Sequence, residues 1–163
     1  MARVLLGIGS NLGDREAALQ SVVDAMAGRF VGVRSSHVYS TPAWGVTDQP
    51  PFLNAVIAAE TELTPMQVLE FAHDCERHAQ RVRDQHWGPR TLDVDVIAYD
   101  ELRSDDPLLT LPHPHAHERA FVLLPLLELE PYFRFPGHGA AADLLPALDA
   151  SGIMRHDTLR VAP

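Results

Sequence analysis

Two hydrophobic periods alternate along the chain and predict its secondary structure. Alternating or continuous apolar runs, which are typical of strands, occupy residues 3–9, 30–39, 52–61 and 87–100. Apolar positions at helical spacing predict helices over residues 15–28, 64–81, 117–128 and, more briefly, 143–150. The order strand, helix, strand, strand, helix, strand predicts an α+β sandwich with an antiparallel sheet. We expect helices over one face of this sheet and a cleft on the other.

Turn and breaker residues place the connections between these elements. Residues 11–14 carry N-cap chemistry for the first helix, and Pro65 stands at the first position of the second. The segment 41–51, rich in Pro and Gly, is too long for a tight turn and predicts a functional loop. A second polar loop is expected over 82–91. From about residue 137 to 163 the pattern weakens, which indicates a C-terminal extension.

Composition restricts the class of protein. With 163 residues and 18.0 kDa, the chain predicts one domain spanning residues 1–163, and we expect a monomer. No apolar run approaches the ~20 residues that cross a bilayer, so no membrane association is expected. Cys75 is the single cysteine, which favours a reducing, cytoplasmic location.

Charge excludes two further classes. The net charge of −9 argues against a general nucleic-acid binder, whose affinity depends on neutralising phosphates. All 13 cationic residues are Arg, so a P-loop with its essential Lys is excluded. Any phosphate chemistry must therefore use Arg, whose planar fork suits bidentate contacts with oxyanions.

Asp93 and Asp95 interrupt the apolar strand within residues 87–100. Residues two apart on a strand face the same way, so the two carboxylates lie side by side and repel each other. They are either partners of turn and salt-bridge groups or ligands of a hard cation such as Mg²⁺. Arg81, Arg83 and Arg90 lie around the preceding loop, which favours a site for a polyphosphate.

The histidines and aromatic residues also have alternative interpretations. His113, His115 and His117 could form a zinc site, although no Cys is nearby, and a single His contacting a nucleotide phosphate is favoured. Phe52 and Phe121 taken alone are typical core residues. Trp44 and Trp87 each lie beside Gly in a polar loop, a setting that suits a ligand cover.

Taken in order, these pieces resemble the 6-hydroxymethyl-7,8-dihydropterin pyrophosphokinase family over roughly residues 3 to 136. The most specific motif is WGPRTLDVD, residues 87–95, followed downstream by Leu111-Pro112-His113. The other matching segments are GSNLG at 9–13, YSTP at 39–42, QP at 49–50, FLN at 52–54, Glu76, RVR at 81–83, and Arg119 with Phe121.

The resemblance implies a ferredoxin-like sandwich and a reaction of folate synthesis. Pyrophosphate would pass from MgATP to the hydroxymethyl group of the pterin, with release of AMP. Asp93 and Asp95 would hold two Mg²⁺ ions that bind the triphosphate.

The resemblance also implies roles for individual residues. The catalytic residues would be Arg81, Arg90, Asp93 and Asp95. The ATP-binding residues would be His73, Glu76, Arg83, Trp87, Val96, Thr110, His113 and Arg119. The pterin-binding residues would be Thr41, Pro42, Trp44, Phe52, Asn54 and Phe121, with the two Phe rings stacking on the flat pterin.

Some positions depart from the family pattern. His73 replaces a common Gln on the ATP-facing helix, Pro114 replaces an aromatic residue, and Phe52 replaces a Tyr with stacking preserved. Two other functions stay open: a ferredoxin-like module that binds a ligand or nucleic acid without catalysis, and a metal-dependent phosphohydrolase that uses the histidines.

Overall fold

The computed structural model describes residues 1–42, 50–82 and 92–161, with the backbone alone for residues 81 and 82. The strands are β1 (Ala2–Ser10), β2 (Val31–Ser35), β3 (His37–Thr41), β4 (Phe52–Thr61), β5 (Asp93–Tyr99), β6 (Ser104–Asp106), β7 (Leu109–Leu111), β8 (Arg134–Phe135), β9 (Gly139–Ala140) and β10 (Met154–Thr158). The helices are α1 (Arg15–Ala25), α2 (Pro65–Val82), α3 (Ala120–Leu129) and α4 (Ala141–Leu144), with 3₁₀ turns η1 (Ala116–Glu118) and η2 (Leu145–Ala147).

The main sheet is antiparallel and places β1 at its centre. Its strand order is β10-β3-β4-β1-β5, and β2 also pairs with β4. Without β10 and β2, the order β3-β4-β1-β5 is that of a ferredoxin-like sheet. Its first strand, β1, lies between β4, which precedes the second helix, and β5, which follows it. The predicted α+β fold with an antiparallel sheet is confirmed.

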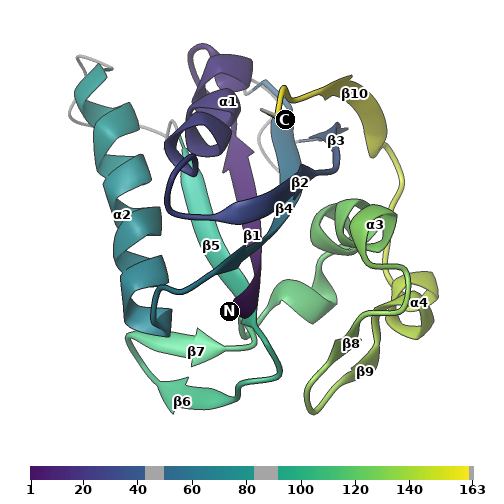
Figure 1. The fold of residues 1–163 in the computed structure, drawn as a ribbon. Coiled ribbons are helices and arrows are strands. Elements are labelled where there is room, and N and C mark those ends of the chain that lie inside the picture. The colour runs from purple at the N-terminus through teal and green to yellow at the C-terminus, as the bar shows by residue number, and fades with distance from the viewer. Residues whose placement is uncertain (43–49, 83–91, 162–163) are drawn as a thin grey trace.

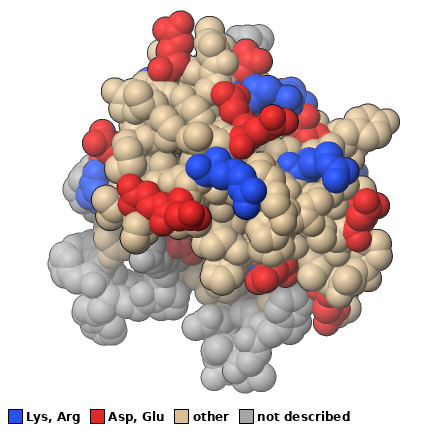
Figure 2. All heavy atoms as spheres, turned by 90° about the horizontal axis from the view of Figure 1, so that it is seen from below, with Lys and Arg blue, Asp and Glu red and all other residues tan. Residues whose placement is uncertain are grey.

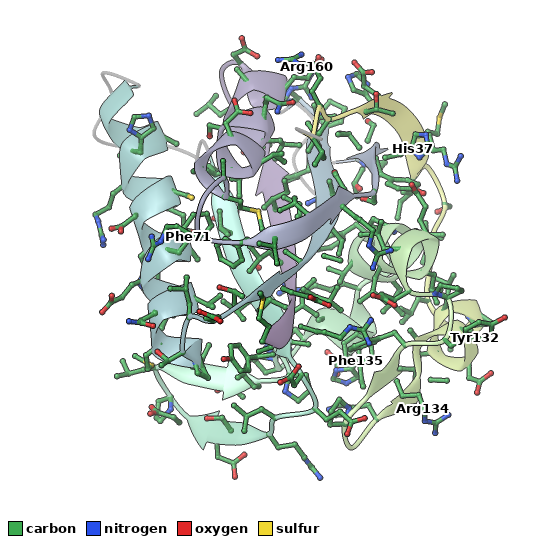
Figure 3. The ribbon with its side chains drawn as sticks, viewed as in Figure 1. His37, Phe71, Tyr132, Arg134, Phe135 and Arg160 are labelled. Atoms are coloured by element: carbon green, nitrogen blue, oxygen red, sulfur yellow. The ribbon has the colours of Figure 1, made fainter. Side chains whose placement is uncertain are left out.

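Helices cover both faces of this sheet to different extents (Figure 1). On one face, α1 and α2 bury a core against β1, β4 and β5 that includes Leu6, Ile57 and Phe71. In Figure 3 the Phe71 ring points from α2 toward the sheet. On the other face, α3 and α4 bury a second cluster around Leu123 and Phe135. The expected helical layer is therefore present, and the C-terminal helices add a second one over part of the opposite face.

The helix boundaries follow the signals in the sequence closely. The Asp14 carboxylate accepts a hydrogen bond of 3.0 Å from the backbone N–H of Ala17, so Asp14 caps α1. Pro65 begins α2 as predicted. The first helix ends at Ala25, three residues earlier than expected, with Gly28 in the left-handed region at φ +84°.

The predicted strand over 30–39 is divided into β2 and β3 at Ser36. The Ser36 N–H donates to the carbonyl of Val56, and the Ser36 hydroxyl accepts from the Val56 N–H at 2.9 Å. A side-chain oxygen thus takes the place of a backbone carbonyl, and regular pairing is interrupted there.

The surface adds two observations. Within the described residues, no helix is long and apolar enough to cross a membrane. Figure 2 shows the face around the start of β1, where acidic and basic side chains are interspersed. Arg3 and Arg34 both pair with Glu130 on this side of the molecule.

Candidate active site

A cavity of about 550 Å³ opens on the face of the sheet that α1 and α2 leave free. Residues from the strands, from η1 and from α3 form its walls. The lining consists of Gly7, Ile8, Gly9, Thr41, Pro42, Phe52, Asn54, Ala55, Asp93, Asp95, Ile97, His113, Ala116, Arg119, Phe121 and Val122. Segments that are far apart in the sequence therefore meet here.

Two glycines of β1 form the floor of this cavity. Gly9 pairs with Asn54 of β4 on one side and with Asp93 of β5 on the other. Gly7 likewise pairs with Asp95. A Cβ atom at Gly9 would lie 2.6 Å from the Asn54 Nδ2 atom, which is closer than real Cβ contacts allow. The absence of side chains at Gly7 and Gly9 leaves room for a ligand between β4 and β5.

One side of the cavity suits a flat, polar ring. Phe52 from β4 and Phe121 from α3 contribute aromatic surface, and Asn54 contributes an amide. The Thr41 hydroxyl is buried and has no hydrogen-bond partner among the described residues. A buried polar atom without a partner costs free energy, so a ligand that bonds it would be favoured.

The other side of the cavity is charged. Asp93 and Asp95 project from β5, and the Nε2 atom of His113 lies 3.8 Å from the Asp95 Oδ2 atom. Burial lowers the pKa of His113, although the negative charge of Asp95 opposes this effect. The Arg119 guanidinium lies 5.7 Å from the centre of the Phe121 ring and links the charged side to the aromatic side.

The alternation of β5 holds the two carboxylates in place. Val94 and Val96 are each 4% exposed and pack into the core under α1 and α2, so Asp93 and Asp95 face the cavity. The Glu76 carboxylate on α2 accepts a 3.0 Å hydrogen bond from the Val94 N–H, between the two aspartates. This contact ties the edge strand to α2 and orients its cavity face.

The donor set fits Mg²⁺ bound together with phosphate. Asp95 keeps 48% of its side chain exposed, and Asp93 lines the same cavity, so both can offer oxygen ligands. Within the described ranges, no three His, Cys, Asp or Glu side chains converge as a complete metal cage. Mg²⁺ commonly completes its shell with water and substrate phosphate oxygens, which such a partial set permits.

The histidine cluster considered as a zinc site is not assembled in the described part of the chain. His113 turns to the cavity, whereas the ring of His117 stacks on His138 at 3.7 Å between centroids. The centre of the His115 ring lies 6.2 Å from that of the His113 ring. The Nδ1 atom of His115 lies 3.5 Å from the Glu118 Oε2 atom.

Comparison with known proteins agrees with this geometry. Residues 5–131 match the family model described as 7,8-dihydro-6-hydroxymethylpterin-pyrophosphokinase (HPPK). The chain belongs to this family. It is 46% identical over 158 residues to 2-amino-4-hydroxy-6-hydroxymethyldihydropteridine pyrophosphokinase of Methylorubrum extorquens, covering 95% of this chain and 99% of the relative.

Other relatives and solved structures extend the comparison. The proteins of the same name from Pseudomonas aeruginosa and Mycobacterium tuberculosis are 40% and 45% identical, over 94% and 80% of this chain and 96% and 74% of their own lengths. The wild-type HPPK-DHPS structure of Plasmodium falciparum aligns with a TM-score of 0.70 at 11% identity. It covers 90% of this chain, which spans 44% of that longer protein, and it supports the HPPK fold alone.

Nine residues predicted from the HPPK resemblance meet at the cavity. They are Thr41, Pro42, Phe52, Asn54, Asp93, Asp95, His113, Arg119 and Phe121. Phe52 and Phe121, which taken alone resembled core residues, are only partly buried and line the cavity.

Four predicted ATP-side residues are placed elsewhere than the cavity lining. His73 is exposed on α2, and the Thr110 hydroxyl bonds the carbonyl of Asp106. The Val96 side chain is buried beneath the opposite face of the sheet, because it alternates with the aspartates. Glu76 bonds the backbone of β5, as described above. Trp44, Arg83, Trp87, Arg90 and the side chain of Arg81 lie outside the described residues.

Seven lining residues were not assigned a site role from the sequence. They are Gly7, Ile8, Gly9, Ala55, Ile97, Ala116 and Val122. The two glycines had a detectable signal, since glycines two apart in a strand leave one face without side chains. The five apolar residues had none, because an apolar residue that lines a cavity has the same pattern as one in a core.

We expect Gly9→Ala to weaken binding of a ligand that contacts Asn54. The added methyl group would displace the Asn54 amide from its position and remove its hydrogen bond, raising the Kd for the pterin roughly tenfold. Isothermal titration of the dihydropterin, in the presence of Mg²⁺ and a non-hydrolysable ATP analogue, measures this change.

Gly7→Ala is the matched comparison for this variant. It adds the same methyl group to the same face of β1, where it meets the flexible end of Ile97 at 3.1 Å. Its effect on the pterin Kd should be smaller. An equal effect of the two variants would contradict a specific role of the Asn54 amide.

Proposed function

We propose that this protein transfers a pyrophosphoryl group from ATP to the hydroxymethyl group of 6-hydroxymethyl-7,8-dihydropterin. The products are AMP and the pterin diphosphate, and the reaction belongs to folate biosynthesis. Membership of the HPPK family supports this activity. The observation that carries the proposal is the pairing of Gly9 with both Asn54 and Asp93, which sets a ring-binding side and a metal-binding side across one strand.

The two sides have complementary tasks in this reaction. The pterin occupies the side with Phe52 and Phe121, where the rings stack on it and Asn54 and Thr41 bond its polar edge. Its hydroxyl oxygen forms a bond to the β-phosphorus of ATP. The bond between that phosphorus and the oxygen shared with the α-phosphate breaks, and AMP leaves. Neighbouring strands lie about 4.8 Å apart, so β4 and β5, which flank β1, are about 10 Å apart, and the pterin and the phosphates can lie next to each other over β1.

Two Mg²⁺ ions held by Asp93 and Asp95 complete the proposed site. When bound, they would neutralise phosphate charge in the transition state. His113, between β7 and η1, and Arg119, between η1 and α3, would contact the ATP phosphates. Arg81, Arg83 and Arg90 would add positive charge, and Trp87 would exclude water. His73, Glu76, Val96 and Thr110 remain predicted contacts on the ATP side, while Trp44 remains a predicted contact of the pterin.

The decisive assay follows AMP by chromatography while ATP, Mg²⁺ and the dihydropterin are omitted one at a time. AMP should appear only when all three are present. ATP consumption without the pterin would instead identify a phosphohydrolase. Binding of the pterin without any turnover would identify a binding module.

Several broader predictions accompany this function. We propose one domain over residues 1–163, a monomer in solution, a cytoplasmic location and no nucleic-acid partner. Analytical ultracentrifugation tests the monomer directly, since a dimer would double the mass of 18.0 kDa.

A further inference from the structure

The C-terminal segment adds a strand to the sheet beside the cavity. β10 pairs with β3, so that Met154 lies opposite Ser40 and Arg155 opposite Tyr39. This pairing ends one residue before Thr41, which lines the cavity. In Figure 1, β10 (yellow) runs beside β3, and the chain then continues toward α1.

The side chains of β10 do not build a core. All five residues from Met154 to Thr158 are exposed. The segment is held instead by contacts at its end: the Gln20 side chain of α1 exchanges two hydrogen bonds, of 2.8 and 2.9 Å, with the backbone of Arg160. Glu16 of α1 also pairs with His156 at 3.0 Å. Figure 3 shows Arg160 beside α1.

The turn around Gly152, which precedes β10, lies close to Pro42 in the cavity wall. Gly152 has a φ of +79°, and a Cβ atom there would lie 2.8 Å from Cγ and 3.4 Å from Cδ of Pro42. The turn is internally bonded, since the Ser151 N–H and hydroxyl both donate to the Asp149 carboxylate, at 2.9 and 2.6 Å. Pro42 therefore rests against a fixed backbone.

The residues just before Gly152 and those of β10 also contact the second wall of the cavity, which α3 provides. Leu148 and Asp149 share a small hollow with Arg119 and Phe121. On β3, the Tyr39 hydroxyl donates a 2.7 Å hydrogen bond to Glu128 of α3. The Arg155 guanidinium lies 4.0 Å from that carboxylate. In Figure 3, His37, a further partner of Glu128, is placed on β3 beside β10.

We propose that the segment from Gly152 to Arg160 positions the pterin side of the cavity, and that Gly152 acts through its contact with Pro42. This inference rests on the proposed function. A strand that merely protected the sheet edge would need neither the close approach of Gly152 to Pro42 nor the ties to α1. The chemistry stays with the cavity residues, and the segment sets the distance between β3 and α3.

A pair of glycine variants separates positioning from backbone strain. Gly152→Ala and Gly28→Ala place alanine at nearly equal positive φ values, +79° and +84°, so both carry similar strain. Only the first meets another group, because no atom of the described residues outside the turn lies within 4 Å of a Cβ at Gly28. Both should lower the melting temperature, and Gly152→Ala by more, because its methyl group also meets Pro42.

The expected difference lies in ligand affinity. Calorimetric titration should show the pterin Kd of Gly152→Ala raised about tenfold, with the Kd of the ATP analogue changed less than twofold. Gly28→Ala should match the wild type in both. Equal pterin affinity in the two variants would overturn the inference, whereas a wild-type protein that binds no pterin would overturn the proposed function first.

Two further comparisons keep the test decisive. If Gly152→Ala does not fold, Gly152→Asn with Gly28→Asn repeats the comparison, because Asn tolerates positive φ and carries the same Cβ. In a Pro42→Ala background, where Cγ and Cδ are absent, Gly152→Ala should raise the pterin Kd no further. A further tenfold rise in the pterin Kd in that background would show that Gly152 does not act through Pro42.

Discussion

Asp95→Asn should lower kcat roughly 1000-fold while the protein stays folded. Asp95 lines the charged side of the cavity beside Asp93, and its side chain is 48% exposed. The amide keeps the size of the carboxylate but loses the negative charge that binds Mg²⁺. AMP formation at saturating ATP, Mg²⁺ and pterin measures the loss.

The free energy of unfolding of Asp95→Asn should rise or stay unchanged. Replacing one of two adjacent carboxylates removes their mutual repulsion, so the free energy of unfolding should not fall. Asp105→Asn, at an exposed position of β6 outside the cavity lining, is the matched control and should retain wild-type turnover. Near-normal activity of Asp95→Asn would refute the role in metal binding.

Arg90→Ala should cost about 3 kcal/mol of transition-state stabilisation, or roughly 150-fold in kcat/KM. Among the described residues, Arg119 is the Arg that lines the cavity, together with two aspartates. An ATP triphosphate adds further negative charge, so we propose that an additional Arg neutralises part of it. Arg90 is the nearest in sequence to Asp93.

The matched control removes a cation that is paired elsewhere. Arg77 of α2 forms an ion pair with Asp74 and is 59% exposed, so Arg77→Ala should change kcat/KM less than twofold. Steady-state kinetics with each substrate varied in turn compares the two variants. Similar losses in both would indicate a general effect of charge and would contradict a specific contact of Arg90 with the transferred group.

The local elements were predictable because their signals are local. An N-cap at Asp14, a Pro at the start of α2 and the apolar runs of β1 and β4 each act within a few residues. The alternation in β5 also predicted that Asp93 and Asp95 share a face. The resemblance then assigned other cavity residues, such as Phe52 and Phe121, that periodicity alone would have left in the core.

Residues whose roles depend on packing could not be assigned in this way. The sequence of β10, MRHDT, has no apolar alternation, and all five side chains are exposed. Only its pairing with β3 makes it a strand. The split at Ser36 likewise depends on Val56, which lies 20 residues away in the sequence.

The sequence by itself determined the α+β class, the family and the pair of aspartates on β5. The tertiary structure decided that Gly9 lies between Asn54 and Asp93, and that Gly152 supports Pro42. The physical reason is that periodicity and capping depend on neighbours along the chain. A cavity depends instead on which strands become neighbours and on the side chains that are absent between them.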